Sequence, residues 1–131
     1  MGASPLSKYQ ELEVLTMSRE RLVVFLYSAL HANLAQARAL LDGDVSARTH
    51  RILKAQDVLN ELLASLDLEA GGELAARLQR IYGWMMVELL EIQARRDAHR
   101  LDRVIAMVRE LHEAWSRAAD ELEAQPAASA P

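Results

Sequence analysis

The sequence predicts an all-α fold, an antiparallel up-down four-helix bundle with a short amino-terminal cap segment. Two observations lead to this prediction. Four segments space their apolar residues three and four positions apart, as a helix with one buried face does. The joints between these segments are short, so consecutive helices must run antiparallel. The three prolines lie near the start and in the tail, and none interrupts a predicted helix.

The first predicted helix begins at Ser18, whose hydroxyl can accept a backbone N–H of the first turn. After this helix, Gly43 suits a left-handed residue, and Asp44 suits the N-cap of the next helix. The buried stripe of the first helix is Val23, Leu26, Leu30, Leu34, Ala37 and Leu41.

The second predicted helix runs from Val45 to Leu66, and Gly71-Gly72 then releases the chain from helical dihedral angles. The third helix is predicted from Glu73 to Arg95. The second helix has the stripe Ile52, Ala55, Leu59, Leu62 and Leu66, and the third has Leu74, Leu78, Ile81, Tyr82, Met85, Leu89 and Ile92.

The fourth predicted helix is capped by Asp97 and completes the bundle. We expect three regions in the chain: a mobile segment with a docking cap over residues 1–17, the bundle over residues 18–123, and a disordered tail over residues 124–131, which lacks large apolar side chains. The stripe of the fourth helix is Leu101, Val104, Ile105, Val108, Leu111, Trp115 and Leu122.

Composition excludes several classes of protein. The 131 residues suffice for one domain, and the absence of cysteine excludes disulfides and thiolate chemistry. A net charge of −4 without a basic stripe argues against nucleic-acid binding. No signal peptide is visible, and no apolar run approaches the roughly 20 residues that cross a bilayer, so no stable membrane insertion is expected. A cluster of four arginines is predicted to be a solvated corner beside Asp97 and Asp102: Arg95, Arg96, Arg100 and Arg103.

Catalytic and metal-binding patterns are missing. No two of the four histidines have the i, i+3 or i, i+4 spacing of ligands on one helical face, and Glu-x-x-His does not occur. Gly71-Gly72 lacks the preceding strand and the lysine of a phosphate-binding loop. The sequence therefore predicts a protein that is not an enzyme and has no cofactor and no metal.

The third helix has more apolar residues than one buried face needs. Between Ile81 and Ile92 only the two glutamates are charged, and Gly83 would permit close backbone approach. Two interpretations stay open: this helix is the most buried one, or it has a second face that accepts an amphipathic helix of another chain. For the second, a groove would form with Leu53, Val58 and Leu63 of the second helix.

A short apolar segment near the amino terminus is a candidate occupant of that groove. It carries Tyr9, Leu12, Val14 and Leu15 and is too short to be a stable helix alone. We therefore expect it to act as a cap that covers the groove.

Ordered sequence fragments resemble the flagellin export chaperones of bacterial flagella, the flagellar secretion chaperones. The resemblance extends from Tyr9 to Ala118, with departures at Met17, Arg19 and Ser28-Ala29. The matching fragments are Tyr9-Gln10, Val14 to Ser18, Leu26-Tyr27, Lys54 to Leu59, Glu61-Leu62, Ser65 to Asp67, Gly71 to Ala75, Leu78, Tyr82, Leu111 and Trp115.

The resemblance implies a chaperone of the bacterial cytosol. Such a protein binds the carboxyl-terminal region of monomeric flagellin, prevents premature polymerisation and delivers the subunit to the flagellar type III secretion apparatus. Homodimerisation of the free protein is left open, and so is the alternative of a helical adaptor for a different secreted or regulatory client. The predicted client-binding residues are Leu62, Leu66, Tyr82 and Met86 in the groove, and Lys54, Gln56 and Asp57 at its polar edge.

Overall fold

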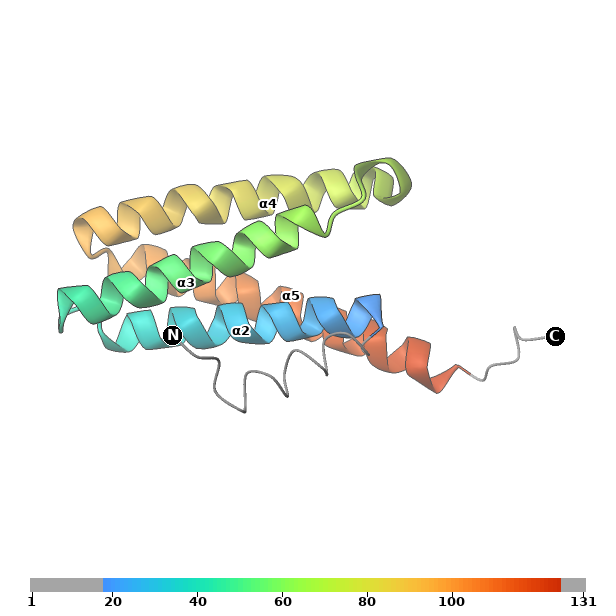
Figure 1. Cartoon of the computed structure of the whole chain (residues 1–131), viewed down its shortest axis with the longest axis horizontal. Helices are drawn as coiled ribbons and strands as arrows, with labels where there is room; N and C mark the ends of the chain where they lie inside the picture. Colours follow the sequence, from blue (N-terminus) through green and yellow to red (C-terminus); the bar gives the residue numbers. More distant parts are fainter. Residues whose placement is uncertain (1–17, 126–131) are drawn as a thin grey trace, which may run out of the picture.

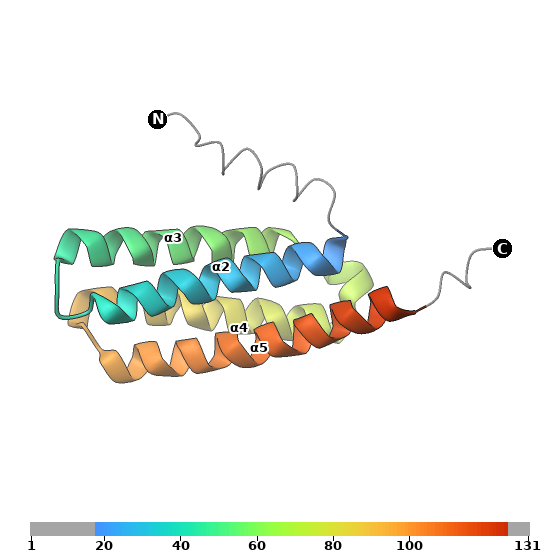
Figure 2. The ribbon, with the colours of Figure 1, turned by 90° about the horizontal axis from the view of Figure 1, so that it is seen from below.

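Four helices form an antiparallel bundle in the computed structural model, which describes residues 18–125 (Figures 1 and 2). They are α2 (Arg19–Ala39), α3 (Val45–Ala64), α4 (Leu68–Arg95) and α5 (Ala98–Ala124). Helix α2 packs against α3 and α5, and α4 packs against the same two helices from the opposite side. This arrangement confirms the predicted all-α up-down bundle. The predicted cap segment and residues 126–131 of the predicted tail lie outside the described residues.

Side-chain caps start the helices. The Ser18 hydroxyl accepts the amide of Arg21 at the start of α2, and the Asp44 carboxylate accepts two amides at the start of α3. Asp97 accepts the amide of Arg100 at the start of α5. These three caps are the predicted ones, and at each the side-chain oxygen accepts an amide of the first turn that has no partner within the helix.

The joint between α3 and α4 differs from the predicted one. Helix α3 ends at Ala64, and α4 begins at Leu68, several residues before the predicted start at Glu73. The reason is a further cap: the Asp67 carboxylate accepts the amides of Glu69 and Ala70, so a helical turn forms before the glycine pair. The break falls at Gly72, which has φ 54° and ψ −132° inside α4.

The left-handed conformation predicted at Gly43 is wrong. Within residues 18–125, positive φ occurs at Gly72 and Arg96. Helix α2 instead ends in a tightened turn, in which the Leu40 amide donates to the carbonyls of Gln36 and Ala37. Because those carbonyls are already satisfied, no left-handed residue is needed after α2. Arg96, at φ 52°, supplies the left-handed turn between α4 and α5.

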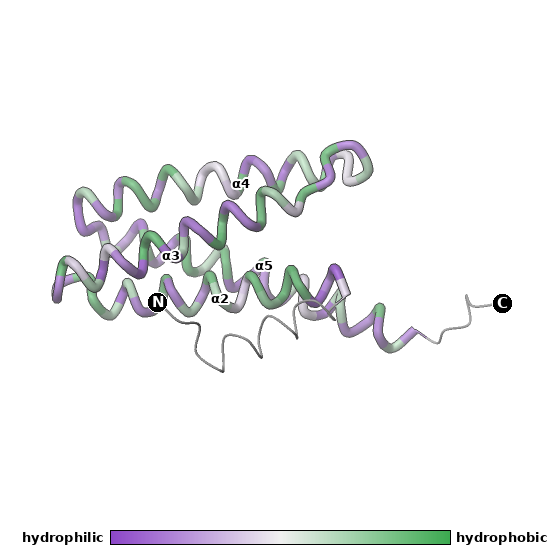
Figure 3. Tube along the Cα trace, viewed as in Figure 1, coloured by the Kyte–Doolittle hydropathy of each residue, from purple (hydrophilic) through white to green (hydrophobic). Residues whose placement is uncertain are grey.

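The core is formed by one face of each helix, and apolar and hydrophilic positions alternate along every helix (Figure 3). Tyr27 and Tyr82 meet at its centre from diagonally opposite helices, with ring centroids 6.3 Å apart and their hydroxyls hydrogen-bonded to each other. Burial raises the pKa of both phenols, Tyr82 and Tyr27. Both hydroxyls therefore stay neutral, and each satisfies the other inside the core.

Two residues predicted in the buried stripes are exposed. Leu74 is 61% exposed, because it lies in the first turn after the break at Gly72 and lines a cavity at the open end of the bundle. Leu122 is 48% exposed and lies in the last turns of α5, which extend beyond the other helices (Figures 1 and 2). Some other stripe residues pack on the core only in part: Leu26, Leu66, Ile81, Ile105, Leu111 and Trp115.

Polar contacts fix the neighbouring helices relative to one another. The buried Glu88 carboxylate of α4 accepts two hydrogen bonds from Arg100 of α5, at 3.1 and 3.2 Å, and Arg100 also bonds Asp97 at 3.2 Å. The amide side chain of Gln93 donates to the hydroxyl of Thr49, at 2.5 Å, and so joins α4 to α3. Both flanks of α4 are thus attached near its carboxyl end.

Candidate protein-binding surfaces

An apolar strip follows the line where α3 meets α4. Leu53 of α3 and Leu90 of α4 are 53% and 63% exposed. The hydrogen bond between Gln93 and Thr49 shows which sides of the two helices face each other. Because the two helices are antiparallel, each turn added to Thr49 along α3 corresponds to one turn subtracted from Gln93 along α4. Leu53 therefore lies near Leu90, and Gln56 lies near Met86. We define the α3–α4 strip as Leu53, Gln56, Met86 and Leu90; Val87, which is 59% exposed, lies further round α4, on the side away from the core.

The strip bears on the two interpretations of the apolar surplus. Helix α4 buries Leu89 and Ile92 completely, so it has a core face like the other helices. Val87 and Leu90 are additional to that face, and burial in the bundle therefore does not account for them. The close backbone approach predicted at Gly83 is wrong, because no neighbouring atom lies within 4 Å of a Cβ placed there.

A cavity of about 280 Å³ opens at the end of the bundle where α2 begins. Its wall includes the turn around Gly71, where a Cβ would lie 2.6 Å from the Cβ of Ala75 and could not be accommodated without movement. The Arg19 guanidinium donates to the Ser65 carbonyl, at 2.7 Å, at the rim. We call this the end cavity, and its apolar lining is Val23, Leu66, Leu74, Leu78, Tyr82 and Trp115.

The structure does not bring the seven predicted client-binding residues into one groove. Leu66 and Tyr82 line the end cavity, whereas Gln56 and Met86 are half-buried in the α3–α4 strip. Leu62 is fully buried and contributes to the core alone in this conformation. Lys54 and Asp57 are exposed on α3, on its outer side beyond the strip.

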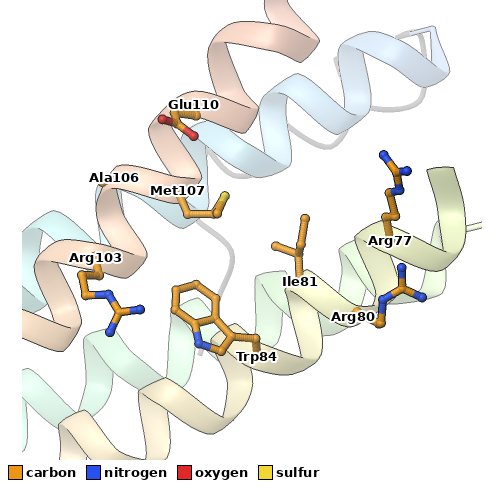
Figure 4. Close-up of a pocket in the computed structure, with 8 residues that line it drawn as sticks. All are labelled: Arg77, Arg80, Ile81, Trp84, Arg103, Ala106, Met107 and Glu110. Atoms are coloured by element: carbon orange, nitrogen blue, oxygen red, sulfur yellow. The ribbon is translucent and has the colours of Figure 1, made fainter.

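A second hollow lies between α4 and α5 and is lined by Arg77, Arg80, Trp84 and Arg103, among others (Figure 4). Sequence reasoning did not find this groove. The spacing of Arg77, Arg80 and Trp84 places them on one side of α4, which is a readable signal. Arg103 was instead expected in a solvated corner, and its guanidinium lies 5.9 Å from the centre of the Trp84 ring.

Neither a membrane-spanning helix nor a metal-binding group occurs among the residues that the structure describes. None of the four helices has both the length and the apolarity that crossing a bilayer requires. Likewise, nowhere in residues 18–125 do three histidine or acidic side chains gather as metal ligands would.

Comparison with known proteins places the chain in a family. The model of a family described as flagellar protein FliS matches residues 2–122. The chain belongs to the FliS family. A flagellar secretion chaperone FliS of Salmonella typhimurium is 34% identical over 109 residues, which cover 82% of this chain and 81% of the relative. FliS is a family of chaperones and not of enzymes.

Further relatives have similar coverage. The flagellar secretion chaperone FliSB of Pseudomonas aeruginosa is 33% identical over 80% of this chain and 84% of its own length. The flagellar secretion chaperone FliS of Bacillus subtilis is 27% identical over 88% of this chain and 86% of its own length. The resemblance inferred from the ordered fragments is thereby confirmed.

Proposed function

We propose that this FliS protein binds the carboxyl-terminal region of monomeric flagellin in the bacterial cytosol. It thereby prevents premature polymerisation and delivers the subunit to the flagellar type III secretion apparatus. The observation that carries the proposal is the α3–α4 strip, an exposed apolar surface on a member of a flagellar secretion chaperone family. A chaperone needs a surface of this kind, because an unfolded client exposes apolar side chains that its folded form would bury.

The energetics favour a long contact. A disordered segment loses conformational entropy when it binds, so the contact must bury enough apolar area to offset that loss. The strip and the end cavity lie on different parts of the bundle, and a client that uses both would wrap along α4. Gln56 and Met86 would then contact the client at the strip, and Leu66 and Tyr82 at the end cavity, with Lys54 and Asp57 at the polar edge.

The cap segment is part of the proposal. Tyr9, Leu12, Val14 and Leu15 lie outside the described residues, but the chain enters α2 at the rim of the end cavity, which Arg19, Glu20 and Val23 help to line. A segment only a few residues before Ser18 has the reach to cover this cavity. We propose that it does so when the client is absent and that client and cap compete. Exposure of the strip leaves homodimerisation of the free protein open.

Leu90→Gln tests the client surface. The substitution removes an exposed apolar side chain from the strip, so stability should change by less than about 0.5 kcal/mol. Burial of a leucine contributes roughly 1.5–3 kcal/mol, and we therefore expect a flagellin carboxyl-terminal peptide to bind about tenfold more weakly or worse in calorimetry.

Leu122→Gln is the matched control, because Leu122 is also an exposed leucine but lies at the end of α5. Equal affinity of the parent and Leu90→Gln proteins for the peptide would refute the strip as the client surface.

The double substitution Leu12→Gln with Leu15→Gln tests the cap in the full chain. If the cap competes, weakening it should strengthen the binding of the peptide or leave it unchanged. Weaker binding by a folded double variant would show that the segment supports the client instead.

A further inference from the structure

The groove between α4 and α5 combines an apolar floor with a basic rim. It has a volume of about 690 Å³, and Ile81, Trp84 and Met107 point into it from the two helices (Figure 4). All three are only half-buried, so their apolar surface is not used up by the core. Arg77, Arg80, Arg103, Ala106 and Glu110 complete the lining.

The geometry of the bundle keeps this groove open. Glu88 and Arg100 hold α4 and α5 together near the joint between them. From there α5 diverges from α4 toward the end where α5 terminates (Figure 1). Ala106, on the α5 side of the hollow, is too small to fill the space that opens.

The charges around the groove are unbalanced. Five other arginines in the described part of the chain make ion pairs with carboxylates: Arg21, Arg38, Arg95, Arg96 and Arg100. Arg77, Arg80 and Arg103 form none with residues 18–125, and the groove itself includes a single carboxylate, Glu110. Positive charge thus gathers here on a chain whose net charge is −4.

We propose that the α4–α5 groove binds an acidic amphipathic helix of a partner protein other than the flagellin tail. Guanidinium groups bind carboxylates in paired hydrogen bonds, and carboxylates three or four residues apart on a helix lie on one side of it. The apolar face of the same helix would pack on Trp84, Ile81 and Met107. A thioether such as that of Met107 adapts its shape to different side chains.

The length of the groove sets the length of the bound segment. Arg77 and Trp84 are seven positions apart on α4, which corresponds to about 10 Å along the helix axis. An occupant of two to three helical turns with two or more carboxylates therefore matches the groove. This surface lies on the flank of α4 opposite the α3–α4 strip, so both could be occupied at once.

The test uses the full-length protein and a synthetic helical peptide of about 14 residues, with leucine on one face and glutamate on the other. Fluorescence of the protein reports binding, because Trp84 lies in the groove. We expect the same peptide with glutamine in place of glutamate to bind at least tenfold more weakly. We expect the double variant Arg77→Glu with Arg80→Glu to lose binding of the acidic peptide by a similar factor.

The matched control is Arg109→Glu with Arg117→Glu, which makes the same change in net charge at two exposed positions of α5 outside the groove. Equal peptide binding by the two double variants, or equal binding of the glutamate and glutamine peptides, would overturn the proposal.

Two further outcomes identify a different occupant and also overturn the proposal. Residues 11 and 13 are glutamates within the chain's own amino-terminal segment. If the double variant Glu11→Gln with Glu13→Gln binds the acidic peptide tenfold more tightly than the parent, the occupant of the groove is the amino-terminal segment of the chain itself. If the double variant Arg77→Glu with Arg80→Glu also binds the flagellin peptide tenfold more weakly, the groove is part of the flagellin-binding site. Unchanged flagellin binding by that variant supports the proposal, whether or not the α3–α4 strip binds flagellin.

Discussion

The two flanks of α4 lie beside the same buried stripe but expose different chemistry. Toward α3, the side chains of Met86 and Leu90 are apolar and uncharged; Met86 is half-buried and Leu90 is exposed. Toward α5, Trp84 and Ile81 are bordered by Arg77 and Arg80. The two proposed binding surfaces therefore differ in the residues that flank the apolar side chains: a mainly apolar flank favours an unfolded client, and an apolar flank with guanidinium groups favours an acidic partner.

The largest expected effect is on stability, and it distinguishes the buried stripe of α4 from the exposed flank at two adjacent positions. Leu89 is fully buried and Leu90 is 63% exposed. Leu89→Ala should lower the free energy of unfolding by roughly 2–5 kcal/mol, because it leaves a cavity, whereas Leu90→Ala should change it by less than about 0.5 kcal/mol. Urea denaturation followed by circular dichroism measures both. Similar losses in the two variants would mean that Leu90 belongs to the core.

Salt should distinguish the two flanks by binding. In about 1 M NaCl the Debye length falls to about 3 Å, so exposed charges are screened. The acidic peptide should then lose most of its affinity for the α4–α5 groove, while the flagellin peptide should bind the strip with nearly unchanged affinity. Titrations of the parent protein at low and high salt compare the two. A parallel loss for both peptides would show that charge dominates on both flanks.

A smaller effect is expected where the central tyrosines join α4 to α2. Tyr82→Phe removes one of two hydroxyls that are hydrogen-bonded to each other and leaves that of Tyr27 without its partner on α4. We expect a loss of about 1 kcal/mol in the free energy of unfolding. Since Tyr82 also lines the end cavity, calorimetry with the flagellin peptide shows in addition whether the hydroxyl contacts the client. An unchanged midpoint of unfolding would mean that the hydrogen bond makes no net contribution.

Low pH should weaken the cap at Asp97, which lies in the joint between α4 and α5. The amide of Arg100 donates to Asp97 and lowers the pKa of that carboxyl below its usual 3.8. A carboxyl whose pKa is lower in the folded state stabilises the fold above its unfolded pKa, and this contribution is lost as pH falls through the folded pKa. Asp97→Asn keeps a capping side chain, so its stability should depend less on pH below about 4 than that of the parent. Parallel pH profiles would exclude this role for Asp97.

The smallest effect concerns the polar edge of the proposed client surface. Asp57 is exposed on the outer side of α3, and an exposed charge contact contributes about 0.2–1 kcal/mol. Asp57→Ala should therefore weaken flagellin-peptide binding by no more than a few-fold. If the variant binds as tightly as the parent at low and moderate salt, Asp57 does not contact the client.

The sequence by itself determined the elements of this protein. Helix periodicity and capping are local properties, so Ser18, Asp44 and Asp97 could be identified as caps, and buried residues such as Leu59 and Leu89 could be assigned to the core. The family resemblance also came from ordered sequence fragments. Even locally, however, the competition between the cap at Asp67 and the glycine break could not be decided from residue types.

Only the tertiary structure decided what the flanks of the helices contact. Most of the predicted client-binding residues lie in the strip, the end cavity or the core. The rotation of each helix and the angle at which it crosses its neighbours determine whether a residue beside the buried stripe is covered. Arg103 lies over Trp84 although 19 positions separate them, and that contact depends on how α5 diverges from α4. Sequence spacing determines the face of a helix on which a residue lies, whereas packing between helices determines whether a partner can reach it.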